Sequence, residues 1–243
     1  MNKRISYLAS LIDSTLLSKN ISKNKLEKFC SEAIINQFYA VCLNPEMVRQ
    51  AFDLLKETNV LLVTVAGFPN GTESTKVKCS QVKNAVRLGA DEVDVVMNFD
   101  LFFSGKYNET IEDILNTVIA AKTENTKRFL VETTVVKVII ETSYLKSIAA
   151  KENKSEDYYI KLASELASDA QADFIKTSTG MHPAGGVQKG DVKLIRSFIP
   201  ESVKVKAAGG IKTFNQVSEL IDEGVNRIGT SSAGTIIKDF YNT

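Results

Sequence analysis

The sequence predicts a single-domain (β/α)8 barrel, also called a TIM barrel, over residues 1–243. Short apolar runs rich in β-branched residues alternate with helical patterns along nearly the whole chain. Several of these runs are apolar without alternation, as expected when helices cover one face of a parallel sheet and packed side chains fill the other. A chain of 243 residues that is 44% hydrophobic can bury one large core of this kind.

The expected strands are eight apolar runs, each followed by polar or glycine residues. In chain order they span residues 11–12, 39–43, 60–65, 93–97, 135–140, 174–175, 203–205 and 228. Alternation alone does not show that the sheet closes. An open, doubly wound sheet is therefore the alternative architecture.

The expected helices lie between these runs and carry apolar residues on one face. Asn44 and Pro45 fit an N-cap followed by proline at the first helical position, and Thr213 with Gln216 fits a capping box. Gly224 then ends the last of these helices. The lysine-rich stretch 146–154 is expected to be a solvated helix start or a loop. The apolar faces fall within residues 48–55, 111–119, 159–170, 192–199 and 217–221.

Composition excludes several classes of partner. Lys plus Arg total 30 against 29 for Asp plus Glu, so no overall field favours nucleic acid or an anionic membrane. No apolar stretch has the length of a membrane span, and the chain start lacks a signal-peptide pattern. We expect a cytoplasmic protein with reduced, mostly buried thiols at its three separated cysteines, Cys30, Cys42 and Cys79.

Two lysines are the strongest candidates for chemistry. Lys176 and Lys206 each end an apolar run and precede a glycine-containing loop. One such lysine is as well explained by a salt bridge or a snorkelling side chain. Two such lysines on successive strands favour a catalytic role. Neighbouring ammonium groups repel, which lowers the pKa of one amine, and a neutral amine attacks carbonyls to form a Schiff base.

Asp94 interrupts an apolar run and is expected to point into the barrel. An unpaired buried carboxylate is costly, and the lysines supply the cations it needs. Asp94 is either a proton shuttle or a member of a structural ion pair. Lys137 lies within its own run and is either a charge partner for Asp94 or a buried support.

Two turns of small residues, 207–212 and 229–232, lie where the last two strands meet their helices. Backbone N–H groups in such turns cradle phosphate, and barrels of this kind commonly bind phosphate there. The expected ligand is a small phosphorylated sugar. His182 is the only histidine, and no cluster of His, Asp and Glu suggests a metal, so we expect no metal and no cofactor.

Together these residues resemble the deoxyribose-phosphate aldolase family along essentially the whole chain. The glycine turns are individually unspecific, but the lysine blocks FIKTSTG and VKAAGG together are specific. The matching blocks are IDSTLL (12–17), VCLNP (41–45), VAGFPNG (65–71), GADEVD (89–94), FIKTSTG (174–180) and VKAAGG (205–210).

The resemblance implies reversible cleavage of 2-deoxy-D-ribose 5-phosphate to acetaldehyde and D-glyceraldehyde 3-phosphate, in the catabolism of deoxyribose phosphate. It implies that Lys176 is the Schiff-base lysine, that Lys206 lowers its pKa, and that Asp94 joins the proton relay. It also implies a set of substrate-binding residues: Asp13, Thr15, Cys42, Asn44, Thr179, Gly180, Gly209, Gly210, Lys212, Gly229, Ser231 and Ser232. A homodimer or a higher homo-oligomer is expected.

The sequence departs from the family at three places. Ser14 stands where many members have histidine, and Lys212 keeps the charge of a frequent arginine but loses its bidentate fork. Loop 181–186 differs, with Met181 where some relatives have lysine, which bears on phosphate affinity. Tyr241 is either a site residue or part of an ordinary chain end.

Two other functions remain open. One is a different Schiff-base barrel aldolase, similar to transaldolase, which would prefer a ketone donor to acetaldehyde. The other is a catalytically silent barrel that binds sugar phosphate as a sensor, since a fold alone does not establish function.

Overall fold

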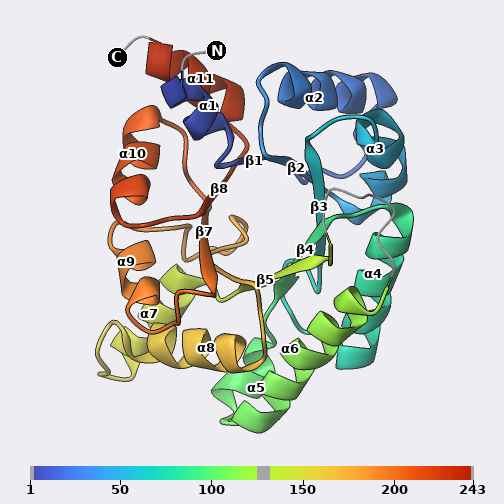
Figure 1. The fold of residues 1–243 in the computed structure, drawn as a ribbon. Helices are drawn as coiled ribbons and strands as arrows, with labels where there is room; N and C mark the ends of the chain where they lie inside the picture. Colours follow the sequence, from blue (N-terminus) through green and yellow to red (C-terminus); the bar gives the residue numbers. More distant parts are fainter. Residues whose placement is uncertain (1–2, 125–131, 242–243) are drawn as a thin grey trace.

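Eight parallel strands close into a barrel surrounded by helices in the computed structural model, which describes residues 3–124 and 132–241 (Figure 1). Each strand pairs with the next, and β1 pairs with β8, so the barrel is closed and the open-sheet alternative is wrong. All eight expected strands are present: β1 Ile12–Leu16, β2 Ala40–Leu43, β3 Leu61–Ala66, β4 Glu92–Val96, β5 Val135–Ile139, β6 Phe174–Lys176, β7 Lys204–Ala208 and β8 Arg227–Thr230.

The helices form the outer ring of the barrel (Figure 1). The capping box of Thr213 and Gln216 is formed, and Asn44 caps a short 3-10 turn, η1 Pro45–Met47, that leads into a helix. The helices are α1 Lys3–Ala9, α2 Lys23–Ile35, α3 Val48–Leu55, α4 Thr75–Leu88, α5 Phe99–Phe103, α6 Tyr107–Lys122, α7 Thr142–Lys151, α8 Tyr158–Asp169, α9 Asp191–Arg196, α10 Phe214–Asp222 and α11 Ala233–Tyr241. Within the described residues no helix is both long and apolar enough to span a membrane.

Three local expectations were wrong. Ile119 belongs to the apolar stripe of α6 by spacing, yet it is 48% exposed. The lysine-rich stretch is not simply solvated, since it overlaps the second half of α7, where the Lys146 amine lies 2.8 Å from the buried carboxylate of Asp191. Cys79 is only half-buried, whereas Cys30 and Cys42 are buried as expected; all three are free thiols.

The barrel interior has an apolar half and a charged half. Successive side chains of a strand point to opposite faces, so alternate residues of each strand enter the barrel. From β2 and β3 these are apolar or small residues: Ala40, Cys42, Leu61, Val63 and Val65. From β1 and from β4 to β8 they include most of the buried charged groups, which places the polar chemistry on one side of the interior.

A buried ion pair fixes α4 and α6 to the strand that carries Asp94. Lys78 is fully buried, and its amine donates to the backbone oxygen of Val96 at 3.0 Å and to the carboxylate of Asp113 at 2.7 Å. The Thr75 hydroxyl donates to the other Asp113 oxygen at 2.6 Å. The carboxyl end of β4 is therefore held from outside the barrel.

Replacing Lys78 with methionine should lower the free energy of unfolding by about 3–5 kcal/mol, because Asp113 would remain buried without its cation. Urea unfolding of Lys78→Met measures the loss. Lys76→Met, an exposed change on the same helix, is the control and should cost under about 0.5 kcal/mol. Equal stability of the two variants would mean that the pair does not hold α4 in place.

Candidate active site

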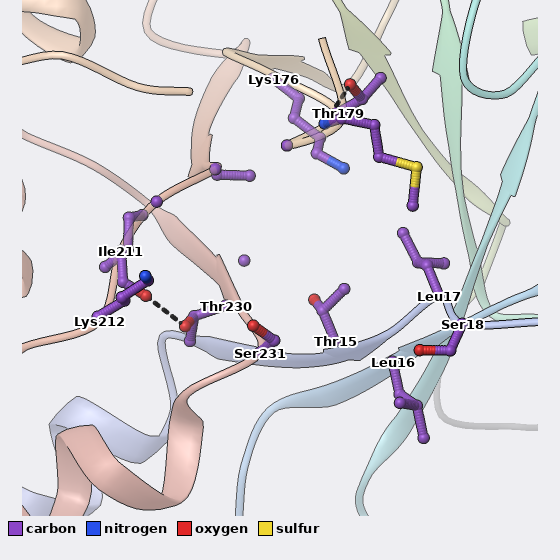
Figure 2. Close-up of a pocket in the computed structure, with 16 residues that line it drawn as sticks. Thr15, Leu16, Leu17, Ser18, Lys176, Thr179, Ile211, Lys212, Thr230 and Ser231 are labelled. Atoms are coloured by element: carbon purple, nitrogen blue, oxygen red, sulfur yellow. Dashed lines mark hydrogen bonds between the residues drawn. The ribbon is translucent and has the colours of Figure 1, made fainter. Parts of the chain in front are cut away.

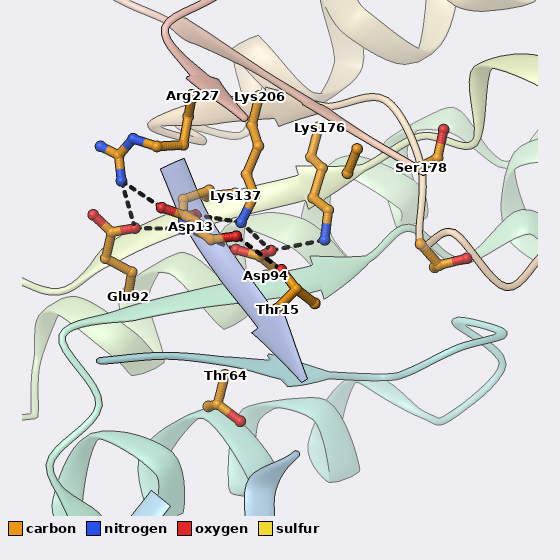
Figure 3. Close-up of polar contacts among 12 residues, drawn as sticks. Asp13, Thr15, Thr64, Glu92, Asp94, Lys137, Lys176, Ser178, Lys206 and Arg227 are labelled. Atoms are coloured by element: carbon orange, nitrogen blue, oxygen red, sulfur yellow. Dashed lines mark hydrogen bonds and ion pairs between the residues drawn. The ribbon is translucent and has the colours of Figure 1, made fainter. Parts of the chain in front are cut away.

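Strand register places the charged interior residues side by side. Asp94 is the β-pair partner of Lys137, and Lys176 is the partner of Lys206. Lys206 in turn pairs with Arg227 across β7 and β8. Because these residues occupy the inward-facing positions of their strands, their side chains meet within the barrel (Figure 3).

Six charged side chains of the barrel interior form a closed ring of alternating charge, which we call the ionic ring. Neighbouring charged atoms along it are 2.5–3.6 Å apart, and every member is nearly or fully buried. In order around the ring the members are Asp94, Lys206, Asp13, Arg227, Glu92 and Lys137. Three carboxylates and three cations leave the ring with no net charge.

Lys176 is attached to the ionic ring but does not belong to it. Its amine donates to Asp94 Oδ2 at 2.8 Å, and the same oxygen accepts from Lys206 at 2.9 Å (Figure 3). Lys176 is thus a fourth basic side chain beside a ring whose own charges already balance. The ring therefore does not need the charge of Lys176, and an amine attacks a carbonyl in its neutral form.

Asp13, Asp94 and Lys206 remain ionised at neutral pH. Burial opposes the charge of Asp13, but the cations of Lys206 and Arg227 outweigh it and lower the pKa of Asp13 to about 2. Burial likewise opposes the charge of Asp94, whose pKa the three neighbouring lysines hold well below its usual range. For Lys206, Asp13 and Asp94 together outweigh burial and raise the pKa, so this amine stays an ammonium.

The sequence left two interpretations of Lys137, a charge partner for Asp94 or a buried support, and in the structure it is both. Its amine lies 2.9 Å from Asp94 and 2.5 Å from Glu92, and its side chain is fully buried. Burial disfavours its charge, but Asp94 and Glu92 outweigh burial and raise its pKa. Lys137 therefore binds Asp94 Oδ1 and leaves Oδ2 to Lys176 and Lys206.

A cavity of about 290 Å³ adjoins Lys176 at the carboxyl ends of the strands (Figure 2). Its apolar lining residues are Leu16, Leu17, Met181 and Ile211, and Ile211 lies beside Lys212, across from Leu16 and Leu17 (Figure 2). Its basic lining residues are Lys176 and Lys212. Nine of the predicted site residues line it: Lys176, Thr15, Thr179, Gly180, Gly209, Gly210, Lys212, Gly229 and Ser231.

Two glycines are required by close approaches around this cavity. Gly209 has φ +89°, and a Cβ there would lie 2.7 Å from the Cα of Gly186 and 3.3 Å from that of Gly180. The loops after β6 and β7 are therefore in backbone contact. A Cβ on Gly229 would lie 3.1 Å from Lys206 Cε, so this position leaves room for the Lys206 side chain.

The other predicted residues lie outside the cavity lining. Asp13, Asp94 and Lys206 lie in the ionic ring, and Cys42 lies in the apolar half of the interior, where burial raises its pKa to about 11 and keeps the thiol protonated. Asn44 caps η1, and Ser232 lines an adjoining groove.

His182 and Tyr241 both lie outside the cavity lining. The His182 ring lies 4.4 Å from that of Tyr144, and its Nδ1 accepts from the backbone of Ala184. Tyr241 is 67% exposed at the end of α11 and does not line the cavity; Asn242 and Thr243 lie outside the described residues.

Sequence reasoning missed Glu92 and Arg227, although a signal was present. Glu92 is two residues before Asp94, and Arg227 is two residues before Gly229, so each shares a strand face with a predicted site residue. Both were overlooked because they lie at the strand starts, away from the strand ends where catalytic groups gather. Within the described residues, no three His, Cys, Asp or Glu side chains form a metal-binding group.

The chain is similar to aldolases in sequence and in structure. The model of the family described as DeoC/LacD family aldolase matches residues 7–237. The deoxyribose-phosphate aldolase of Carboxydothermus hydrogenoformans is 42% identical over 231 residues, 95% of this chain and 94% of the relative. That of Thermococcus kodakarensis is 42% identical over 240 residues, 98% of each chain.

Solved structures agree with these sequence matches. An aldolase called QR15 superposes with a TM-score of 0.84 at 35% identity, covering all of this chain and 97% of the other. A deoxyribose phosphate aldolase from Aeropyrum pernix, described as a unique tetrameric structure, has a TM-score of 0.83 at 29% identity, with 98% and 92% covered.

The lowered pKa of Asp13 predicts acid sensitivity. A carboxylate with a folded pKa of about 2 stabilises the fold above its unfolded pKa of 3.8, and this stability is lost as the pH falls through both values. Urea unfolding should therefore show a loss of about 2 kcal/mol from this group between pH 4 and pH 2. Asp13→Asn should be less stable at neutral pH and less dependent on pH in that range; an unchanged dependence would contradict the assignment.

Proposed function

Because the chain belongs to the DeoC/LacD family of aldolases, we propose that it reversibly cleaves 2-deoxy-D-ribose 5-phosphate to acetaldehyde and D-glyceraldehyde 3-phosphate. The chemistry proceeds through an imine on Lys176. One observation carries the proposal: an amine at the floor of a cationic cavity, attached to a buried ring that is neutral without it.

The first half of the reaction forms the imine. The neutral amine of Lys176 attacks C1 of the open-chain sugar, and the resulting carbinolamine loses water to give an iminium ion. Asp94 lies 2.8 Å from the Lys176 nitrogen, so its carboxylate stabilises the iminium charge as it forms. Lys206 donates to the same carboxylate and is the neighbouring ammonium that supplies a proton to the departing hydroxyl, directly or through a water.

The second half breaks the carbon–carbon bond. Removal of the proton from the C3 hydroxyl sends the C2–C3 electrons into the iminium, which becomes an enamine and releases D-glyceraldehyde 3-phosphate. Protonation of the enamine at C2 restores an iminium, and water then hydrolyses it to free acetaldehyde and the Lys176 amine. Asp94 and Lys206 carry these protons, with water as the relay.

The phosphate end of the sugar is assigned to the other side of the cavity. Lys212 supplies a cation there, and the glycine turn at Gly209 and Gly210 and the turn at Ser231 supply small residues whose backbone approaches a ligand closely (Figure 2). Met181 lines the same cavity without adding charge, so Lys212 carries most of the electrostatic attraction.

We extend the proposal to the state of the protein in the cell, where it acts as a cytoplasmic homo-oligomer in deoxyribose phosphate catabolism. The absence of a membrane-spanning helix from the described residues is consistent with this location. The tetramer described for the Aeropyrum pernix relative supports self-association, which size-exclusion chromatography with light scattering would measure.

Borohydride reduction with acetaldehyde should leave a two-carbon adduct on Lys176, detected by intact mass and peptide mapping. Lys176→Arg keeps the charge and bulk but should give no adduct at this position, because the guanidinium is not nucleophilic. Lys204→Arg, an exposed change on β7, is the matched control and should give the same Lys176 adduct as the wild-type protein.

The outcomes separate the candidate functions. An adduct from a ketone donor in preference to acetaldehyde would favour the transaldolase-like alternative. Binding of deoxyribose 5-phosphate without any adduct would favour the sensor.

Lys212→Ala should raise KM for deoxyribose 5-phosphate by about 10–100-fold with a smaller effect on kcat, because a charge-assisted contact to phosphate would be lost. Cleavage of unphosphorylated 2-deoxyribose should change little. Steady-state kinetics with both sugars measures the difference, and Lys204→Ala is the control. An equal loss for both sugars would place the phosphate elsewhere.

A further inference from the structure

The ionic ring reaches well below the reacting amine, into residues that contact neither the cavity nor Lys176. Arg227 lies opposite Asp94 in the ring and is the member farthest from Lys176 along the chain of contacts, and Glu92 is one of its two neighbours. Arg227 also stacks on the Tyr39 ring, with its guanidinium carbon 3.3 Å from the ring centroid. An arginine and a glutamate buried together at this depth cost desolvation energy, so their position calls for a physical reason.

We propose that Arg227 and Glu92 are positioning residues that set the proton equilibrium of Lys176 by fixing the net charge of the ring beneath it. Arg227 donates to Asp13 Oδ1 at 2.9 Å, which leaves Oδ2 to Lys206 at 2.5 Å. Glu92 lies 2.5 Å from the Lys137 amine, whose other partner is Asp94. Through these contacts the pair acts on both residues that adjoin Lys176.

Charge counting gives the two residues opposite effects. Without Arg227, three carboxylates face the cations of Lys137 and Lys206, and the interior is neutral only when Lys176 is protonated. Without Glu92, two carboxylates face three cations, and the interior carries a positive charge even when Lys176 is neutral. Loss of Arg227 therefore favours the ammonium form of Lys176, and loss of Glu92 favours the amine.

The ionisable groups around Lys176 come from five elements. Asp94 on β4 contacts it, Lys206 on β7 and Lys137 on β5 share that carboxylate, and Lys212 lies across the cavity after β7. The Cys42 thiol on β2 stays protonated because burial raises its pKa to about 11. Asp13 on β1 acts through Lys206. Among these groups, the ring members pair their charges with one another around the closed ring.

The experiment measures how acetylation of Lys176 by acetic anhydride depends on pH, by quantitative peptide mapping between about pH 6 and pH 10. Only the neutral amine reacts, so the half-maximal pH reports the proton equilibrium directly. Arg227→Met should move this midpoint up by about one pH unit, and Glu92→Gln should move it down by a similar amount. The double variant, whose ring is neutral again, should return close to the unchanged protein.

Two further variants separate charge from structure. Arg227→Lys keeps the charge and should keep the midpoint, even if losing the guanidinium fork lowers stability. Arg87→Met removes an exposed arginine, paired with Glu124 on the surface, and should also leave the midpoint unchanged. The thermal midpoint of each variant confirms that a folded protein was labelled.

The catalytic meaning of the inference rests on the proposed function, but the labelling test does not. If Arg227→Met and Glu92→Gln move the midpoint in the same direction or leave it unchanged, the ring does not set the proton equilibrium and the inference is overturned. Absence of an acetaldehyde adduct from the unchanged protein would instead overturn the aldolase mechanism. When both hold, the acid limb of kcat/KM should shift in the same sense as the labelling midpoint.

Discussion

The arrangement of charges in this barrel interior depends on electroneutrality among side chains that are buried from solvent. A lysine used as a nucleophile must lose its proton, yet a lysine placed among carboxylates holds its proton more tightly. The structure meets both demands by matching three carboxylates with three other cations before Lys176 is counted. The reactive amine can then use Asp94 as a hydrogen-bond partner without being required to neutralise it.

The rest of the fold serves this arrangement. Register in the closed sheet brings charges from β1, β4, β5, β7 and β8 to one side of the interior, and apolar side chains from β2 and β3 fill the other side. Gly229 gives the Lys206 side chain its space, and Lys78 holds the end of β4 from outside the barrel. The glycine contact holds the turn after β7, which is assigned to phosphate, against the loop after β6.

The barrel and the upper part of the site could be predicted from the sequence because local signals mark them. Apolar runs identify strands, and polar residues where those runs stop identify candidates such as Lys176, Lys206 and Thr179. The lower part of the ring was harder to find. Glu92 and Arg227 stand at the beginnings of their strands, and their pairing spans 135 positions of the chain, which only register and barrel closure bring together.

Helical spacing was also a good guide in α3, α8 and α10, but it failed at Ile119, which continues the stripe of α6 into solvent. Spacing reports which face a residue occupies, not how far the neighbouring element extends to cover it. Likewise Lys146 belongs to a lysine-rich segment, and only the tertiary fold brings the Asp191 carboxylate within 2.8 Å of it. A lysine-rich segment therefore predicts solvent exposure only for the lysines that the tertiary fold leaves at the surface.

The division of the interior into two halves has a consequence for how this sequence can diverge. In the apolar half, single replacements that conserve volume are tolerated one at a time. In the charged half, losing any one member leaves its neighbours in the ring buried and uncompensated, so accepted changes should occur as pairs of opposite sign. The apolar half would then accumulate independent single substitutions. The charged half would accumulate paired substitutions on strands that are distant in the chain.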